Sequence, residues 1–453
     1  MSFFSLAQPT VDSNYLRVNG IYIKGNEKTK AFIITRELTF QQNDSIPETA
    51  IISEIERSKN NLMNTALFNF VDLKHVRVDS STFNVIIEVI ERWYFWPLPI
   101  FELAETNFNT WWLNKDFSRI NYGTYLVKEN FRGRRETIKF KFQWGFTQNI
   151  GFQYAVPYIN KKKTLGVSGT FSFAQNHEVN YQSVNNKRIF YKDVNQFLKQ
   201  EYFARIATAY RSKLYNTHTF ELDYVNASIN DTLTVLSSDF FKDNRTRTNY
   251  FGINYWFRHD KRDYASYPLK GHRIDFFAKK YGLGTSFENQ LNLMELSTNL
   301  TYHLPLAGRF YAAAGLFGKT TLFDVSPYFI QKGLGYSEVV RSYEYYVVDG
   351  QHYGLFKSNI KYQIIKPKVE KVDILNKTQF NTIPYALYFN VFFDSGYVVD
   401  DLYASKNKLA NSLLLGTGIG IDLVTYYDMV IRTEFSMNRM GESGFFLNFV
   451  KAI

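Results

Sequence analysis

The residue types that could carry enzyme chemistry do not form a catalytic pattern in this chain. Its seven histidines include no HExxH motif and no close pair at metal-ligand spacing, and the chain contains no cysteine. A thiolate zinc site and a cysteine nucleophile are therefore excluded. We expect solvated or singly hydrogen-bonded histidines, no metal or other cofactor, and no enzyme activity.

Two glycine motifs resemble nucleotide-binding sequences but lack the required context. Phe317-Gly318-Lys319-Thr320 resembles the end of a phosphate loop, yet Ala313 stands where the first glycine belongs and the segment has a strand pattern. Gly416-Thr417-Gly418-Ile419-Gly420 resembles half of a dinucleotide fingerprint, and no helix follows it. We expect a strand there, with its glycines on one face and its larger side chains on the other.

Composition favours strands that cross a membrane. Aromatic residues make up 18% of the 453 residues, yet the mean hydropathy is only -0.28. No run of apolar residues is long enough for a helical span, whereas transmembrane strands alternate faces and keep the average hydropathy low. The net charge of +11 comes from dispersed Lys and Arg residues, which argues against nucleic acid as a partner and favours anionic lipids or a charged lumen.

The first 95 residues predict a short leader and one small domain. Residues 1–15 read as the remnant of a signal peptide or as a disordered terminus. Residues 16–95 then predict the order β-α-α-β-β, with a first strand near Val18, a helical stretch that follows Gly25-Asn26 and runs through Leu38, and two strands at Val71–Val78 and Phe83–Ile90. The spacing of Ser45 and Glu48 predicts a capping box that begins the second helix.

Residues 96–453 predict one transmembrane barrel. In Thr137–Trp144, apolar and polar side chains alternate, and the pattern repeats with the same sense along the chain. The alternation predicts fifteen antiparallel strands between about residues 119 and 452. Because bacterial single-chain barrels have even strand numbers, we expect a sixteenth strand within 177–199 or 320–335, and a wet lumen.

The small domain resembles a POTRA domain of the BamA/TamA outer-membrane assembly (bacterial surface antigen) superfamily. The matching segments are Ile21–Thr29, Ile34–Leu38, Asn64–Phe68 and Val85–Arg92. Within them we single out six candidate residues, which are Gly25, Asn26, Arg36, Glu37, Leu67 and Phe68. The resemblance implies a periplasmic domain followed by a C-terminal barrel.

A second match lies in an irregular stretch at about residues 327–353. Val340-Arg341-Ser342-Tyr343 resembles the Val-Arg-Gly-Phe/Tyr tip of the loop that folds back into the barrel in this superfamily. Phe392–Gly396 resembles the family's Phe-x-Asp-x-Gly strand, and alternation along that strand turns Asp394 inward. The resemblance therefore implies an ion pair between Arg341 and Asp394 that pins the loop, with Gly396 beside it.

This region also departs from the family pattern. Ser342 replaces the usual glycine, so the backbone of the tip is expected to differ if that position needs a positive φ. Lys361 stands near the usual place of a second acidic partner, so we expect a single carboxylate to suffice for Arg341. An alternative interpretation, a solvent-exposed Arg341, remains open.

Two further matches lie in connections between strands. Asp260–Tyr264 with Tyr267–Gly271 resembles the family's Asp-x-Arg-Asp…Pro-x-x-Gly turn, which we interpret as a tight periplasmic turn without a further role. Asn130–Gly133 with Glu136 matches at the first hairpin. The resemblance covers about residues 17–453.

The resemblance implies an outer-membrane protein assembly factor, or insertase, in a Gram-negative bacterium, with the POTRA domain in the periplasm. Its partners would be unfolded outer-membrane polypeptides, outer-membrane lipids and accessory assembly proteins, and not nucleic acid. Release would occur at a lateral seam between the first and last strands, for which we predict Ile120, Tyr122, Gly123, Phe445, Leu447 and Phe449. A polypeptide secretion pore of the same superfamily and a plugged porin or surface protein remain alternatives.

Overall fold

The computed structural model describes residues 14–103, 111–112, 115, 117–283, 291–323, 327–371, 382–425 and 429–451. The expected leader lies outside these residues except for its last two. The chain divides into two compact units, Met1–Arg92 and Trp93–Ile453. Each unit is described by itself.

The N-terminal unit is a four-stranded mixed sheet with two helices. Its strands have the order β2-β1-β4-β3, and β1 and β4 are parallel whereas the other pairs are antiparallel. The elements are β1 (Tyr15–Lys24), α1 (Ala31–Thr35), β2 (Ser45–Pro47), a 3-10 turn (Glu48–Ala50), α2 (Ile51–Met63), β3 (Phe68–Arg77) and β4 (Thr82–Glu91).

The core of this unit forms where α2 buries one stripe against the sheet. Ile51, Ile55 and Leu62 recur at helical spacing and are all buried. Inward residues of β4, such as Phe83 and Ile87, are completely buried. Alternation in the strands and the 3.6-residue period in α2 thus define one core between two layers.

The predicted capping box is wrong. Ser45 begins the short strand β2, which pairs with β1 so that Ile46 lies opposite Leu16. The N-cap of α2 is Ala50, and no side chain caps that helix. Burial of Ile46 in the sheet therefore outweighs the local side-chain bond that the spacing suggests.

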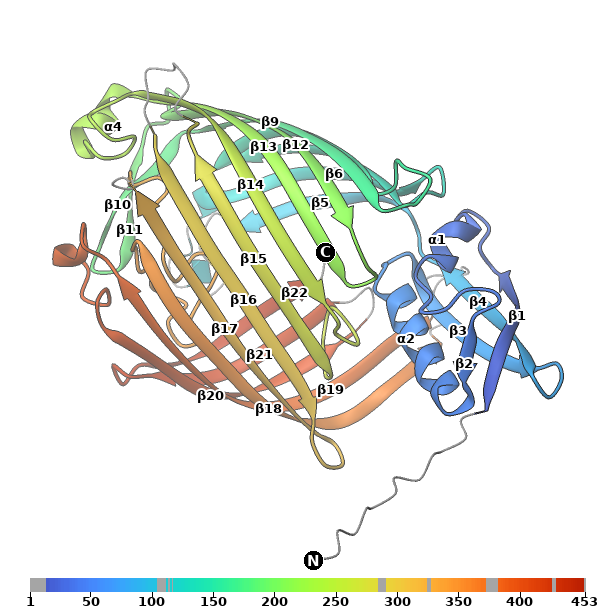
Figure 1. Ribbon diagram of the computed structural model, residues 1–453. Helices are drawn as coiled ribbons and strands as arrows, with labels where there is room; N and C mark the ends of the chain where they lie inside the picture. Colours follow the sequence, from blue (N-terminus) through green and yellow to red (C-terminus); the bar gives the residue numbers. More distant parts are fainter. Residues whose placement is uncertain are drawn as a thin grey trace, which may run out of the picture. The chain divides into compact units, whose positions relative to one another are not determined.

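The second unit is a single antiparallel sheet of 16 strands that wraps around a common axis (Figure 1). Each strand pairs with its neighbour along the chain, except that a separate hairpin of β10 and β11 interrupts the series between β9 and β12. The strands are β5 (Phe95–Leu103), β6 (Ile120–Phe131), β7 (Glu136–Gly145), β8 (Thr147–Val156), β9 (Leu165–Asn176), β10 (Glu178–Val184), β11 (Lys187–Lys192), β12 (Lys199–Arg211), β13 (Asn216–Ile229), β14 (Arg247–Asp260), β15 (Gly271–Tyr281), β16 (Leu293–Pro305), β17 (Phe310–Phe323), β18 (His352–Lys371), β19 (Thr382–Val399), β20 (Leu413–Val424), β21 (Met429–Asn438) and β22 (Ser443–Lys451).

The sixteenth strand is not where the sequence predicts it. It is β5, which precedes the first predicted strand and pairs with β6 along its length. The segment 177–199 forms the separate β10–β11 hairpin instead, and β17 ends at Phe323. Pro97 and Pro99 weaken the strand pattern of β5, and they are tolerated because β5 is an end strand of the sheet.

Apolar and polar residues occupy opposite faces of this sheet. Ile150, Ile253 and Ile419 are exposed on the outer face, whereas Asp223 and Asp394 are completely buried on the inner face. This is the alternation expected of a barrel whose outer face contacts lipid. Among the described residues, no helix is long and apolar enough to cross a membrane.

The two ends of the barrel differ in the lengths of their connections. At one end, here called the loop end, long segments follow β9, β13, β17 and β19, and they include the β10–β11 hairpin and α4 (Asp231–Leu236) (Figure 1). At the opposite end, here called the turn end, short connections follow β6, β12 and β16. An exception at the turn end is the longer segment 261–270 between β14 and β15.

Candidate functional site

The connection from β17 to β18 folds onto the inner face of the barrel wall. We call residues 327–351 the inward loop. Leu334, Val340 and Val348 of the loop pack against Leu355 of β18 and Leu414 of β20 in one buried cluster. A β-bridge between Leu334 and Val348 closes the loop on itself. The loop is thus an ordered insertion with its own apolar contacts.

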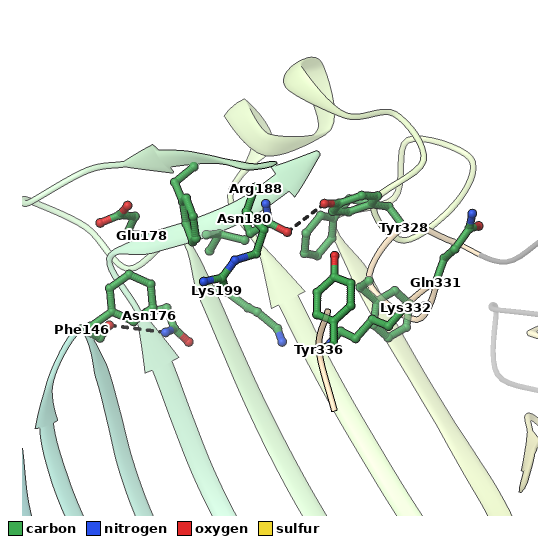
Figure 2. Close-up of a pocket in the computed structure, with 14 residues that line it drawn as sticks. Phe146, Asn176, Glu178, Asn180, Arg188, Lys199, Tyr328, Gln331, Lys332 and Tyr336 are labelled. Atoms are coloured by element: carbon green, nitrogen blue, oxygen red, sulfur yellow. Dashed lines mark hydrogen bonds between the residues drawn. The ribbon is translucent and has the colours of Figure 1, made fainter. Parts of the chain in front are cut away.

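The base of the inward loop is held by the β10–β11 hairpin. The Tyr328 hydroxyl donates to Asn180 Oδ1 at 2.8 Å and lies 3.0 Å from Ser183 Oγ. Figure 2 shows Tyr328, Lys332 and Tyr336 of the loop facing Asn180 and Arg188 of the hairpin around a cavity of about 300 Å³. The hairpin that interrupts the barrel series therefore supports the loop.

Arg341, at the tip of the inward loop, forms a bidentate ion pair with Asp394 of β19. Nε and Nη2 of Arg341 donate to the two Asp394 carboxylate oxygens at 2.8 and 2.6 Å, and the Arg341 backbone N–H adds a third bond at 3.1 Å. Nη2 also donates to the Ser358 carbonyl, and the guanidinium lies 3.7 Å from the centre of the Phe392 ring. Arg341 is 7% exposed and Asp394 is fully buried. The structure thus places the predicted pair together and excludes a solvent-exposed Arg341.

A second carboxylate also contacts Arg341, which corrects the expectation of a single acidic partner. Glu434 Oε1 of β21 lies 3.4 Å from Arg341 Nη1. The ammonium group of Lys361 lies over the Tyr267 ring at 3.8 Å. Sequence reasoning missed Glu434, although alternation along β21 would have placed Arg432, Glu434 and Ser436 on one face.

Glycines of the wall make room for the loop tip. A Cβ atom on Gly416 would lie 1.9 Å from the Arg341 carbonyl oxygen, and one on Gly396 would lie 2.6 Å from Val340 Cγ2. The glycine run of β20 is therefore a strand, as its pattern predicts. Its inner face carries no side chains at the glycines, which leaves space for the backbone of the loop tip.

The remaining tip residues are buried and the backbone is strained. Val340 and Tyr343 are almost completely buried. Ser342 has φ of +78°, a left-handed conformation that favours glycine. Its carbonyl accepts a hydrogen bond from Asn438 Nδ2 at 3.1 Å, whereas its buried hydroxyl makes none among the described residues. The tip therefore has the positive φ that glycine adopts without strain, although serine occupies this position.

The turn at 261–270 is more than the tight turn that we predicted. Tyr267 is buried, and its hydroxyl donates to Asp422 Oδ2 of β20 at 2.7 Å. Its ring packs against Tyr388 of β19 in a tilted arrangement with centroids 4.7 Å apart, and the Lys361 ammonium group of β18 lies over it. The turn end of the barrel therefore has its own insertion, which reaches the same wall that receives the inward loop.

The predicted seam residues are only partly correct. Ile120, Tyr122 and Gly123 lie in β6, which is bonded to both β5 and β7 and is therefore not an end strand. Phe445, Leu447 and Phe449 do lie in β22, which ends the sheet on the other side. Among the described residues, no pairing joins β5 to β22. The error arises from the missed strand β5.

The candidate residues of the N-terminal unit are structural in their contacts. Gly25 has φ of +83°, and a Cβ there would lie 2.0 Å from the Val89 carbonyl oxygen. Asn26 donates to the Thr29 carbonyl, and Arg36 lies 3.5 Å from Glu37. Leu67 and Phe68 belong to the buried core.

At the hairpin between β6 and β7 of the barrel, Arg132 Nε donates to Glu136 at 2.9 Å. Within the described ranges, no group of three His, Asp or Glu side chains could hold a metal ion.

Comparisons with known proteins agree with this fold. The sequence matches no protein-family model and no curated protein. Among solved structures, the crystal structure of BamA from Haemophilus ducreyi lacking POTRA domains 1–3 is 13% identical, with a TM-score of 0.55, over 96% of this chain and 84% of that chain. CdiB from Escherichia coli is 8% identical, with a TM-score of 0.50, over 99% of this chain and 92% of that chain.

These comparisons define the class of fold. The chain has an N-terminal small mixed-sheet unit followed by a 16-stranded antiparallel barrel, as the resemblance implies. The predicted resemblance to the BamA/TamA superfamily is confirmed at the level of the fold.

Proposed function

We propose that this protein is an outer-membrane insertase that templates β-barrel polypeptides and releases them laterally into the bilayer. The observation that carries the proposal is that β5 and β22 end the sheet without a described pairing between them. The edge strand of a sheet that opens binds an extended polypeptide through main-chain hydrogen bonds, which gives affinity with little sequence specificity. This activity needs no covalent chemistry and no cofactor.

The backbone of β5 supports a weak seam. The Glu129 N–H donates to the Tyr94 carbonyl, which sets the pairing of this strand with β6. The backbone N–H and C=O groups of successive residues in a strand point to opposite neighbouring strands. Since those of Tyr94 point to β6, the backbone nitrogens of Pro97 and Pro99 point away from β6, toward the outer edge of β5. Proline has no N–H, so this edge lacks two donors and cannot form a complete ladder with any strand.

Connection lengths favour one orientation in the membrane. Outer-membrane barrels have short periplasmic turns and long extracellular loops. On this rule the turn end faces the periplasm, and the N-terminal unit, which enters β5 from that end, is a periplasmic POTRA domain in a Gram-negative bacterium. The proposed partners are unfolded outer-membrane polypeptides, outer-membrane lipids and accessory assembly proteins.

Depletion of this protein, followed by a census of assembled outer-membrane proteins, tests the proposal. An insertase predicts a general loss of folded barrels. A loss confined to one secreted protein indicates a dedicated secretion pore, and an unchanged census favours a porin or surface protein. Either of these last two results contradicts the insertase.

A seam lock tests lateral release itself. The natural chain has no cysteine, so introduced pairs form unambiguous disulfides. Cysteines at Leu98 or Ile100 of β5 are combined with cysteines at Phe446 or Asn448 of β22 in all combinations, because all four side chains lie on the inner face and no described pairing fixes the register across the seam. Oxidation should stop assembly of client barrels, and reduction should restore it. Normal assembly by an oxidised, fully cross-linked protein contradicts lateral release.

A secretion pore is the second candidate, and the cavities of the lumen favour it. Two cavities of about 340 and 330 Å³ are lined by charged side chains, including Arg341 and Lys357 in one and Arg205 and Arg273 in the other. A polar lumen suits a translocating chain. The inward loop and the 261–270 turn would both have to leave it, so this candidate predicts channel conductance that rises when either insertion is deleted.

A further inference from the structure

Two insertions enter the barrel from opposite ends and meet the same wall. The inward loop brings Arg341 to β19 and β21, and the 261–270 turn brings Tyr267 to β19 and β20. We infer that Tyr267 positions the inward loop through the acidic and basic side chains that separate it from Arg341.

A continuous series of polar contacts connects the two residues. The Tyr267 hydroxyl donates to Asp422 Oδ2 at 2.7 Å, and Arg432 Nε donates to Asp422 Oδ1 at 2.8 Å. The same Arg432 Nε lies 3.9 Å from Glu434 Oε1, and this oxygen lies 3.4 Å from Arg341 Nη1. We call these four contacts the relay. Every step joins groups of opposite charge or a hydroxyl and a carboxylate.

Burial makes the relay sensitive to the loss of any one member. Asp422 and Glu434 are almost completely buried, and Tyr267 is 5% exposed. A hydrogen bond to a charged group stabilises more than one between neutral groups, and interior contacts are little screened. When the Tyr267 hydroxyl is absent, Asp422 loses one of its partners and binds Arg432 differently. The change passes to Glu434, which Arg432 and Arg341 share.

The turn itself is built to hold Tyr267 in place. Asp263 Oδ1 accepts hydrogen bonds from the backbone N–H groups of Tyr264 and Leu269, at 2.8 and 3.1 Å. Arg262 forms a bidentate pair with Asp260 at 2.8 and 2.7 Å, which joins the turn to the end of β14. Side chains on both sides thus fix the conformation of the 261–270 turn. The turn is therefore already ordered when Tyr267 bonds to Asp422, and this bond does not have to offset the entropy of ordering it.

Register aligns Tyr388, which contacts the Tyr267 ring, with two wall residues of the relay. Tyr388 lies opposite Asp422, and Asp422 lies opposite Arg432, on three adjacent strands. Glu434 is two residues from Arg432 and therefore on the same inner face. The 261–270 turn, which enters from the turn end, consequently acts on Glu434. Glu434 is also a residue that receives Arg341 of the inward loop, which enters from the loop end.

Thiol labelling of the full-length protein in detergent micelles tests this inference. A Val348→Cys reporter sits in the inward loop at a buried position (2% exposed), so a water-soluble maleimide reacts only when the loop opens. We expect Tyr267→Phe to raise the labelling rate about tenfold, as the loss of a hydrogen bond to a charged group would. Arg341→Lys, which removes the bidentate pair, provides the positive control.

Matched controls separate positioning from general destabilisation. Tyr302→Phe removes a hydroxyl from an exposed tyrosine of β16 and should leave the rate unchanged. A second reporter, Ala207→Cys, is buried on β12 outside the clusters that contain inward-loop residues, and it should label at the same rate in all variants. Faster labelling of both reporters would mean that Tyr267 supports only global stability, which overturns the inference.

Two further outcomes decide the question. Unchanged Val348→Cys labelling in Tyr267→Phe, alongside faster labelling in Arg341→Lys, overturns the inference. If Tyr267→Phe does not fold, Asp422→Asn removes the central charge with the same shape and is measured with the same reporters.

In the double variant of Tyr267→Phe and Arg341→Lys, the relay predicts an increase in labelling rate smaller than the product of the two single increases, because both changes act on one pathway. No client polypeptide is present, so the result is independent of the proposed insertase function.

Discussion

The barrel wall has two regions that use the same charged residues differently. In the early wall (β7–β16), acidic residues pair with arginines directly across the ladder, as Arg205 does with Asp223 and Arg258 with Asp275. In the late wall (β18–β21), Arg432 pairs with Asp422 in the same way. Two further carboxylates differ, because Asp394 lies between Lys357 of β18 and Gly416 of β20, and Glu434 lies opposite Gly420. The first arrangement ties neighbouring strands together, whereas the second leaves two carboxylates for an insertion.

This difference gives a physical rule for the candidate site. A buried carboxylate needs a partner, because an unpaired charge away from water costs several kcal/mol. Where the cross-strand neighbour is glycine, no side chain on that strand can supply the partner, and the same glycine clears space for one to arrive. The late wall is thus built to receive Arg341, while the early wall is complete without an insertion.

The largest expected effect comes from removing the cation of each region in turn. Arg341→Ala leaves Asp394 and Glu434 buried without this partner, which costs about 3–5 kcal/mol. Arg205→Ala leaves buried Asp223 with Asn254 Nδ2 at 2.8 Å and Lys279 at 3.9 Å, so we expect a smaller cost. With the Val348→Cys reporter, Arg341→Ala should raise the labelling rate at least about 100-fold and Arg205→Ala should barely change it. Equal effects of the two variants would remove the distinction between the walls.

A smaller effect should follow from filling the glycine face of the late wall. Gly416→Ala places a methyl group 1.9 Å from the Arg341 carbonyl oxygen, and the resulting overpacking costs about 1–3 kcal/mol of loop binding. Gly151 of β8 is the matched control in the early wall, because a Cβ there meets its neighbours at 3.5 Å or more. We expect Gly416→Ala to raise the labelling rate about ten- to a hundredfold and Gly151→Ala to leave it unchanged. Tight loop binding in Gly416→Ala would contradict the role given to the glycine face.

Much of this site could be predicted from sequence because strands have a strict period. Alternation alone turns Asp394 inward, and the same rule applied to β21 would have found Glu434. The tip at Val340–Tyr343 was found by resemblance. Together these signals placed the loop and its principal partner at the correct positions.

The errors have a different physical origin. β5 was missed because Pro97 and Pro99 break a strand pattern, and only the sheet order shows that an end strand tolerates them. Tyr267 was missed because its partner Asp422 is 155 residues away, and a turn signal describes only local backbone. The capping box failed because tertiary burial of Ile46 outweighed a local bond. Local rules thus identify elements, and contacts between distant elements lie beyond them.

The smallest expected effect concerns the backbone of the tip and has the opposite sign. Ser342 adopts φ of +78°, which costs a non-glycine residue about 1 kcal/mol, and its hydroxyl is buried without a hydrogen bond among the described residues. Ser342→Gly should relieve both costs while the backbone carbonyl keeps its bond to Asn438. We expect the Val348→Cys labelling rate to fall about fivefold. Ser342→Ala separates the two causes, since it removes the hydroxyl and retains the strained φ, so it should recover only part of the gain. A higher labelling rate in Ser342→Gly would contradict this expectation. It would mean that the entropy that glycine adds to the open loop outweighs the strain it relieves in the closed loop, and that Arg341 alone holds the tip in position.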